Sequence, residues 1–446
     1  MPKDLSPSPF FAELERVKTC AKKDAAEGGL SFIDMTVSSP VKAGLSVDLN
    51  AAVDEGRESF GCWNPDAAGW KSAREAVVEY YRERGGNFTA GQIILTASTS
   101  EAYSVLFKTF CDPGDVILTP MPGYPLLDTL AQLEHLECAP YFLQLRRENA
   151  RKLATDERRE GAAFRFVLDS DSLLAAPEKA KILLLVSPHN PTGHCISREE
   201  WNAAVRFCEE NGMVLVVDEV FGDYAFSDKV KRTWEYVFGL CPPEPSLSQS
   251  SPSKSFSAEG RKSIHCRFND FWDAGGGDFI NLPEDGPKCP IFWLNGLSKA
   301  VGSPQLKLGW MAFYAPRERF EEIRAALEFV EDAYLSVSAP AQALGSALLK
   351  QSAAYESRVK ERLLQNWQTL REAFPSKYCP EVLGGWYAVV RLGEDDEDLT
   401  LRLLREKHVL VQPGFFFDFD EDGWVVISLL QEPALFKEAV RRMADR

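Results

Sequence analysis

Short apolar runs alternate with longer amphipathic stretches between about residues 90 and 310 of this 446-residue chain. Strands joined by crossover helices produce such an alternation, and they form a parallel sheet that is covered by helices on both faces. The sequence therefore predicts an α/β fold whose large domain has three layers, αβα, around a mostly parallel sheet. The clearest strands are expected at residues 93–96, 116–118, 182–186, 214–217 and 292–294.

A different pattern follows residue 315, with a long helical segment at residues 317–334, further helices and two later strands. Helices and strands that are segregated in this way indicate a smaller α+β domain. We expect residues 51–315 to form the large domain, and residues 1–50 together with 316–446 to form the small domain.

One low-complexity stretch interrupts the large domain at about residues 241–290, where serine is frequent and three glycines are consecutive. Such a composition buries too little apolar surface to offset the entropy lost on ordering. We expect this stretch to be a surface insertion.

Composition and charge exclude several classes of partner. Lys and Arg number 50 against 66 Asp and Glu, and the resulting net charge of −16 disfavours nucleic acid or an anionic membrane. No apolar run approaches the roughly 20 residues that span a bilayer, and the start lacks a secretory signal, so a cytoplasmic location is expected. The 10 cysteines lack CxxC spacing, which indicates reduced thiols and no metal site.

Lys299 ends the sequence Gly-Leu-Ser-Lys, a few residues after the apolar run Ile291-Phe-Trp. Burial at the end of a strand lowers the pKa of a lysine from about 10.4 and leaves a neutral amine that can form a Schiff base with a carbonyl. The alternative is an ordinary lysine whose stem packs on the core while its head reaches water.

Two other polar residues follow predicted strands. Asn190 opens an Asn-Pro-Thr-Gly turn, and Asp218 comes directly after the apolar run Val214-Leu-Val-Val. Ligands of open α/β sheets bind at the carboxyl ends of strands, which favours a functional site for both residues. A plain turn at Asn190 and a helix cap or ion pair at Asp218 are the alternatives.

Hydroxyl groups gather where a strand is expected to pass into a helix, at Ser98, Thr99 and Ser100. Unpaired backbone N–H groups and the helix dipole at such a point favour an anion such as phosphate, although simple capping is also possible. Ser98 with Glu101 fits a capping box, as does the pair Ser197 and Glu200. Tyr124, in Pro-Gly-Tyr-Pro, lies after the next strand and can stack on a flat ring or pack in the core.

Together these groups match what pyridoxal phosphate requires. The cofactor needs an amine for a Schiff base, an anion at the pyridine nitrogen, a donor at the ring oxygen and a phosphate cradle. The order of the segments, from Thr-Ala-Ser-Thr-Ser-Glu-Ala to Gly-Leu-Ser-Lys, resembles that of the class I/II aminotransferases. These are fold-type-I pyridoxal-phosphate enzymes, and the likeness extends from about residue 30 to the C-terminus.

The resemblance implies that Lys299 forms the internal aldimine and moves the proton between the substrate and the cofactor. It implies that Asp218 pairs with the pyridinium nitrogen and that Asn190 donates to the 3′ oxygen. The other cofactor-binding residues are expected to be Tyr124, stacked on the ring, Ser298, and the phosphate-binding Ser98, Thr99, Ser100 and Lys307. A homodimer with active sites at the subunit interface is also implied.

Several positions depart from the family pattern around the cofactor. A phenylalanine, Phe221, replaces a common tyrosine, so one hydrogen bond to the ring oxygen is missing, and Tyr224 is a candidate to replace it. Gly296 stands where a serine is usual, and Lys307 stands where an arginine is usual, which removes a bidentate phosphate contact. Trp63 takes the place of a tyrosine that reaches a neighbouring subunit's phosphate.

The largest departure concerns the substrate. Val426 aligns with the arginine that binds the α-carboxylate of the amino acid in the family, and an aliphatic side chain cannot bind an anion. Lys42 is our preferred substitute and Arg391 is another, although either fits a solvated surface cation.

Three functions are compatible with these observations. The leading one is an aminotransferase that exchanges an amino group between an amino acid and a 2-oxo acid. A pyridoxal-phosphate-dependent lyase, or another reaction at the α-carbon, uses the same electron sink. A non-catalytic relative that binds cofactor or a partner is the third, and the intact Lys299, Asp218 and Asn190 argue against it.

Overall fold

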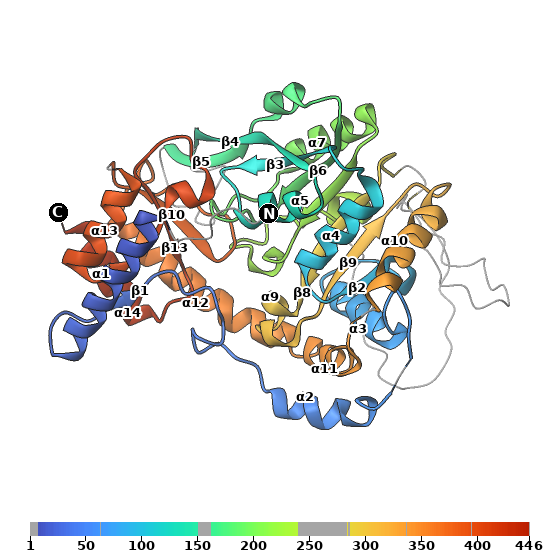
Figure 1. Cartoon of the computed structure of the whole chain (residues 1–446), viewed down its shortest axis with the longest axis horizontal. Helices are drawn as coiled ribbons and strands as arrows, with labels where there is room; N and C mark the ends of the chain where they lie inside the picture. The colour runs from blue at the N-terminus through green and yellow to red at the C-terminus, as the bar shows by residue number, and fades with distance from the viewer. Residues whose placement is uncertain are drawn as a thin grey trace, which may run out of the picture.

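An eight-stranded sheet forms the centre of the large domain (Figure 1), with the strand order β2-β9-β8-β7-β6-β3-β4-β5. The computed structural model describes residues 8–62, 64–149, 162–239, 283, 286–335, 337–393 and 395–445. The strands are β2 (Ile93–Thr96), β3 (Val116–Met121), β4 (Glu137–Asn149), β5 (Ala162–Leu168), β6 (Ala180–Val186), β7 (Val214–Asp218), β8 (Ile291–Gly296) and β9 (Gly309–Tyr314). The predicted surface insertion at residues 241–290 lies almost wholly outside the described residues.

The predicted α/β class and mostly parallel sheet are confirmed. Strands β8, β7, β6, β3 and β4 run parallel to one another. Strand β9 is antiparallel to both β2 and β8, and β5 is antiparallel to β4. All five predicted strands are present, whereas β4, β5 and β9 were not predicted.

Helices cover both faces of the sheet, because the apolar runs supply side chains to each face in turn. In β6, Leu183 packs in the cluster that contains Trp201 of α7 (Arg198–Asn211). Its neighbour Leu184 packs in the opposite cluster, with Leu106 of α4 (Thr99–Phe110). The second face is completed by α5 (Leu126–Leu133) and α10 (Phe320–Tyr334). The two clusters lie between the sheet and the helices on its two faces, as expected for three layers.

The helix starts follow the predicted caps, with one difference. At α7 the capping box is complete, since Ser197 Oγ accepts from Glu200 N at 3.2 Å and Glu200 accepts from Ser197 N at 2.7 Å. At α4, Ser98 Oγ accepts from Glu101 N at 3.2 Å, but the Glu101 carboxylate accepts from the N–H of Ala97 instead of Ser98. The N–H of Ser98 therefore is not used by the capping box.

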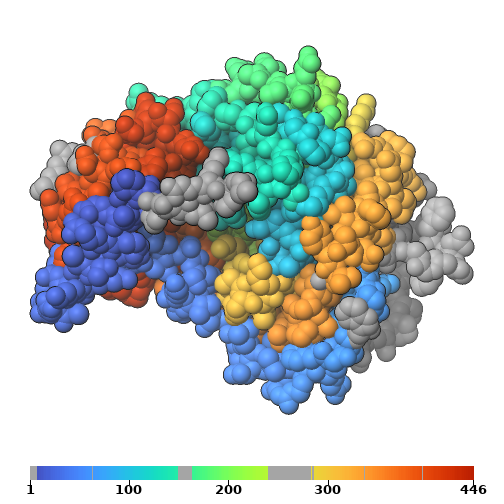
Figure 2. All heavy atoms as spheres, viewed as in Figure 1, coloured from blue at the N-terminus to red at the C-terminus, as the bar shows by residue number. Residues whose placement is uncertain are grey.

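The smaller part of the molecule combines both ends of the chain. Strand β10 (Tyr387–Arg391) and β12 (Gln412–Pro413) flank β13 (Trp424–Ser428), and β1 (Ile33–Asp34) pairs in parallel with β11 (Val409–Leu410). The helices here are α1 (Pro9–Ala26), α13 (Asp396–Lys407), α14 (Pro433–Ala444) and the long α12 (Ser352–Ala373). Figure 2 shows the N-terminal segment in dark blue against the C-terminal segment in red.

Two helices beyond the expected boundary at residue 315 pack on the large sheet's side of the molecule. Helix α10 contacts α4, and α11 (Ala339–Leu349) contacts α2 (Leu49–Gly56) and α3 (Lys71–Arg82). The described residues also include the short helices α8 (Glu235–Phe238) and α9 (Leu297–Ala300). Among the described helices, none combines the length and the apolar character that crossing a bilayer requires.

Candidate active site

A cavity of about 320 Å³ opens at the carboxyl ends of β6, β7 and β8. This edge of an open α/β sheet is where ligands bind, because loops diverge there and leave a crevice. Nine of the residues predicted to serve catalysis or cofactor binding line the cavity: Ser98, Thr99, Ser100, Tyr124, Asn190, Asp218, Ser298, Lys299 and Lys307. The predicted substrate residue Lys42 is exposed and is not among the lining residues.

Lys299 lies on α9, directly after β8, and its amine faces two aromatic rings. Nζ is 4.9 Å from the ring centroid of Trp386 and 5.5 Å from that of Phe221. Burial lowers the pKa of Lys299 to about 8, and the negative charge of Asp218 opposes this change. A substantial fraction of the amine is therefore neutral near physiological pH, as a nucleophile or general base requires.

Asp218 is the last residue of β7, and both of its oxygens accept hydrogen bonds. Tyr103 Oη donates to Oδ2 at 2.6 Å, and the backbone N–H of Val220 donates to Oδ1 at 3.0 Å. Burial raises the pKa of Asp218, and these two donors together with the charge of Lys299 oppose the rise. The carboxylate is thus held in one orientation beside the cavity.

Tyr103 was not predicted from the sequence as a residue of the site. It lies on α4, four residues after the Thr99 that lines the cavity, and this spacing puts both on one face of the helix. That spacing was the available signal, but an aromatic residue in an apolar helix reads first as core. Burial, and next the charge of Asp218, raise the pKa of Tyr103 well above its usual range, so the hydroxyl stays protonated and donates.

Asn190 is held by a tight turn between β6 and α7. The N–H of Gly193 donates to the carbonyl of His189 at 2.8 Å, and Gly193 has a φ of 69°. A Cβ at Gly193 would lie 2.5 Å from Val382 Cγ1, so a side chain has no room there. The Oδ1 of Asn190 is buried and makes no hydrogen bond within the described part of the chain.

The start of α4 forms a cradle whose donors would suit an anion. Ser98, Thr99 and Ser100 line the cavity together with Lys307, and their hydroxyls and first-turn N–H groups are the donors that a phosphate needs. Gly309 of β9 passes close behind them, since a Cβ there would lie 3.0 Å from Ser98 C and 3.1 Å from Thr99 N.

A close approach of β9 to β8 explains why residue 296 is a glycine and not the serine that is usual in the family. A Cβ at Gly296 would lie 3.0 Å from both Gly309 Cα and the carbonyl oxygen of Leu308. Any side chain at residue 296 would therefore need the backbone of β9 to move. The glycine fits the tight pairing of β8 with β9 next to the cradle.

Two hydroxyl groups that were not predicted to belong to the site lie on the side of the cavity away from the large sheet. Ser38, which follows β1, and Tyr387 of β10 both line the cavity. Burial raises the pKa of Tyr387 to about 12, so this hydroxyl remains protonated. These residues are 349 positions apart in the chain, and only the fold brings them together.

The candidate anchors for a substrate carboxylate lie elsewhere. Val426 is fully buried in β13, between β10 and β12. Arg391 forms an ion pair with Glu421 and lines a different cavity. Among the described residues that line the cavity of Lys299, the cationic side chains are Lys299 and Lys307.

Two further departures concern Phe221 and Trp63. Phe221 lines the cavity, so an apolar ring occupies the place of the usual tyrosine. Tyr224, the candidate to replace the missing hydroxyl, does not line the cavity. Its hydroxyl donates to the carbonyl oxygen of Lys299 at 2.6 Å. It therefore does not replace the missing hydroxyl of Phe221. Trp63 lies outside the described residues. Tyr124 lines the cavity and is 42% exposed.

Comparison with known families agrees with this geometry. A family model described as "Aminotransferase class I and II" matches residues 50–263 and 268–443. The chain belongs to this family. Class I/II aminotransferases of this fold use pyridoxal phosphate, and the cavity offers the donors, carboxylate and amine that this cofactor needs. The part of the chain that is described contains no group of His, Cys, Asp and Glu arranged to hold a metal ion.

Named relatives of this aminotransferase align with it along most of their length. Glutamate-pyruvate aminotransferase AlaA of Haemophilus influenzae is 22% identical over 436 residues, which cover 94% of this chain and 91% of that protein. Tyrosine aminotransferase of Mus musculus is 24% identical, with 98% and 84% covered. The solved structure of alanine aminotransferase from Pyrococcus furiosus has a TM-score of 0.71 and 19% identity, with 98% of each chain covered. At that identity the structural likeness concerns the fold.

Proposed function

We propose that this aminotransferase moves an amino group between an amino acid and a 2-oxo acid, with Lys299 as its catalytic amine. The observation that carries the proposal is the position of Lys299, which lines the same cavity as Asp218 and the α4 cradle and whose lowered pKa suits it to exchange protons there. The related glutamate-pyruvate and tyrosine aminotransferases support an amino-acid substrate.

The predicted cofactor-binding residues that line the cavity each have a proposed contact to pyridoxal phosphate. Asp218 would face the pyridine nitrogen, Asn190 would donate to the ring oxygen, and Tyr124 would stack on the ring. The phosphate would be held by Ser98, Thr99, Ser100 and Lys307, and Ser298 is a further cofactor-binding residue. When bound, the cofactor supplies an electron sink for the electrons of the substrate's α-carbon.

The chain's own groups would then carry the proton transfer. The neutral amine of Lys299 would take the proton from the substrate's α-carbon and pass it to the cofactor. Asp218 would stay negative and so keep the pyridine nitrogen protonated. The rings of Phe221 and Trp386 lie beside the amine and limit the access of water to it.

We also propose a homodimer that works in the cytoplasm, as the sequence and the resemblance predict. The division into a large domain of residues 51–315 and a small domain of residues 1–50 and 316–446 remains a proposal. The packing of α10 on α4 argues that the boundary lies later than residue 315, before or within α12.

A spectroscopic experiment tests the function. The purified protein is loaded with pyridoxal phosphate, reduced with borohydride and digested, and mass spectrometry is expected to find the cofactor on Lys299. Addition of amino acids without reductant is expected to convert the cofactor to its amine form and to release the matching 2-oxo acid. Release of ammonia together with the oxo acid would instead support a lyase. A protein that binds no cofactor would overturn both reactions.

A further inference from the structure

Two consecutive residues of the 3-10 turn Gly222–Tyr224 connect to opposite ends of the segment that carries Lys299. Tyr224 Oη donates to the carbonyl oxygen of Lys299 at 2.6 Å. At the other end, Asn295 Nδ2 donates to Tyr80 Oη at 3.1 Å, and Tyr80 Oη donates to Asp223 Oδ2 at 2.7 Å. The segment from Asn295 to Lys299 is thus tied at both ends to one turn.

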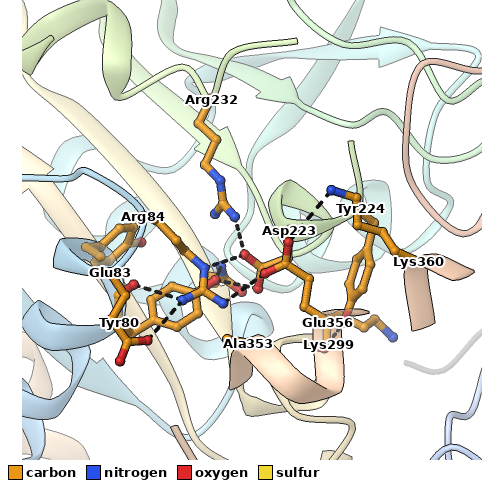
Figure 3. Close-up of polar contacts among 12 residues, drawn as sticks. Tyr80, Glu83, Arg84, Asp223, Tyr224, Arg232, Lys299, Ala353, Glu356 and Lys360 are labelled. Carbon is orange, nitrogen blue, oxygen red and sulfur yellow. Dashed lines mark hydrogen bonds and ion pairs between the residues drawn. The ribbon is translucent and has the colours of Figure 1, made fainter. Parts of the chain in front are cut away.

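Buried charges fix that turn. Asp223 accepts from Arg84 Nε at 2.8 Å and also forms an ion pair with Arg232, and Figure 3 shows both guanidinium groups directed at its carboxylate. The side chains of Asp223 and Arg84 are 2% and 9% exposed. Burial alone would raise the pKa of Asp223, but Arg84 and Arg232 hold it well below its usual range. The carboxylate is therefore charged across the working pH range.

The same cluster reaches two helices, α3 and α12. Arg84 lies over the ring of Tyr80, with 3.9 Å from its Cζ to the ring centroid, and its Nη2 is 3.1 Å from Glu356 of α12. Together with α3, which carries Tyr80, these contacts tie the turn after β7 to the helices around it. A charged group with several fixed partners in a low-dielectric setting rigidifies its surroundings.

The Asn295 end reaches the cavity through the backbone. Asn295 Oδ1 accepts from the N–H of Gly296 at 2.7 Å, and the N–H of Leu297 donates to the carbonyl of Leu308 at 3.0 Å. Gly296 and Lys299 both line the cavity. The main chain that carries the amine is therefore held before, within and after the turn into α9.

We propose that Asp223 and Tyr224 position the amine of Lys299 by clamping the segment from Asn295 to Lys299 at its two ends. The inference rests on the proposed function, in which the amine must leave and return to one point during each turnover. Neither residue touches the cavity, so both act through Lys299 and are positioning residues. A misplacement of about 1 Å in such a group can cost two orders of magnitude in rate.

Tyr224→Phe tests the clamp, with Tyr355→Phe as a matched control. Tyr355 is a fully buried tyrosine of α12, and its hydroxyl makes no hydrogen bond to any described residue. Both substitutions remove one buried hydroxyl, but only the first removes a contact to Lys299. If Tyr224→Phe does not fold, Tyr80→Phe breaks the other end of the clamp and serves in its place.

The first measurement uses the protein without cofactor. The rate at which a small acylating reagent modifies Lys299 is followed against pH by mass spectrometry, which gives the pKa of the amine. Asp218 is the charged group that faces the amine, and it is unchanged in all variants. Tyr224→Phe is expected to raise the midpoint, because a looser segment exposes the amine to water, whereas Tyr355→Phe leaves it unchanged.

The second measurement uses the loaded enzyme. Tyr224→Phe is expected to lower kcat about tenfold with little change in KM, since proton transfer suffers and substrate binding does not. Equal midpoints and equal kcat in Tyr224→Phe and Tyr355→Phe would overturn the clamp. Failure of the proposed function is a separate result, because the wild-type protein would then bind no cofactor while the labelling comparison still stands.

Discussion

The hydroxyl of Tyr103 lies 2.6 Å from Oδ2 of Asp218. A helix on one face of the sheet, α4, therefore orients the carboxylate that ends strand β7. The same helix α4 begins with the Ser98–Ser100 cradle. One helix therefore carries both the residues of the cradle and the tyrosine that orients the carboxylate.

Tyr103→Phe is expected to weaken cofactor binding. Without this donor the pKa of Asp218 rises further, because burial then acts with less opposition, and the negative charge offered to the pyridine nitrogen falls. Hydrogen bonds to charged groups contribute about 1.5–3 kcal/mol, so we expect the Kd for pyridoxal phosphate to rise at least about tenfold. Absorbance titration measures it. Tyr141→Phe is the control, since that buried hydroxyl donates to Leu184 O outside the cavity.

The amine of Lys299 is expected to titrate near pH 8 in the cofactor-free protein, against an ordinary value of 10.5. Burial disfavours the charged form, so the neutral amine predominates above the lowered pKa. Asp218→Asn is expected to lower the midpoint further, because the charge of Asp218 raises it. Labelling of Lys299 against pH checks both statements. A native midpoint equal to that of the denatured chain would contradict them.

Phe221→Tyr is expected to lower the pKa that is read from the absorbance of the bound cofactor. The new hydroxyl would add a hydrogen bond at the ring oxygen that Phe221, on the cavity wall, cannot make. A spectroscopic titration of the wild-type and variant proteins compares the two values. Identical titrations would show that the missing hydroxyl has no effect on the cofactor.

Tyr387→Phe is expected to raise KM for the amino acid several-fold, because the Ser38–Tyr387 pair offers hydroxyl donors on the small-domain side of the cavity. The prediction that Lys42 binds the carboxylate is tested in the same assay with Lys42→Ala. A raised KM in Lys42→Ala would support that residue. An unchanged KM would remove it, and an unchanged KM in Tyr387→Phe would remove the hydroxyl pair.

Asp223→Asn is expected to destabilise the fold by about 3–5 kcal/mol at pH 7, because Arg84 and Arg232 lose a buried counter-charge. The folded pKa of Asp223 lies below its ordinary 3.8. Its stabilising contribution is therefore complete above that value and is lost as the pH falls toward the folded pKa.

Urea unfolding measures this loss. Asp54→Asn is the control, since the pair of Asp54 with Arg57 is about 70% exposed on both sides and such pairs contribute less than about 1 kcal/mol. A loss in Asp223→Asn no larger than in Asp54→Asn would contradict the prediction.

The sequence predicted the residues that directly follow the buried parallel strands. Asn190, Asp218 and Lys299 were identifiable because strands β6, β7 and β8 are continuous apolar runs, and a polar residue at the end of such a run is conspicuous. Tyr103 was not identifiable in the same way, since its role depends on which face of α4 meets β7.

Other features depend on contacts between distant segments. Strand β9 was missed because its sequence, Gly-Trp-Met-Ala-Phe-Tyr, has no periodicity that separates a strand from a buried helix. Ser38 and Tyr387 meet only after both ends of the chain have folded together. Lys42 was chosen for its charge and its place in the sequence, and neither property determines the direction of a side chain.

The short parallel pair of β1 and β11 has a consequence for the order in which the cavity is assembled. Ile33 pairs with Val409, and Met35 accepts from the N–H of Ser428, so Ser38 is positioned by residues that a ribosome adds last. The elements that carry Lys299, Asp218 and Asn190 are synthesised well before β11. A nascent chain stalled before residue 409 would therefore contain the amine and the acid, but β1 would have no strand to pair with and the substrate side would still be open.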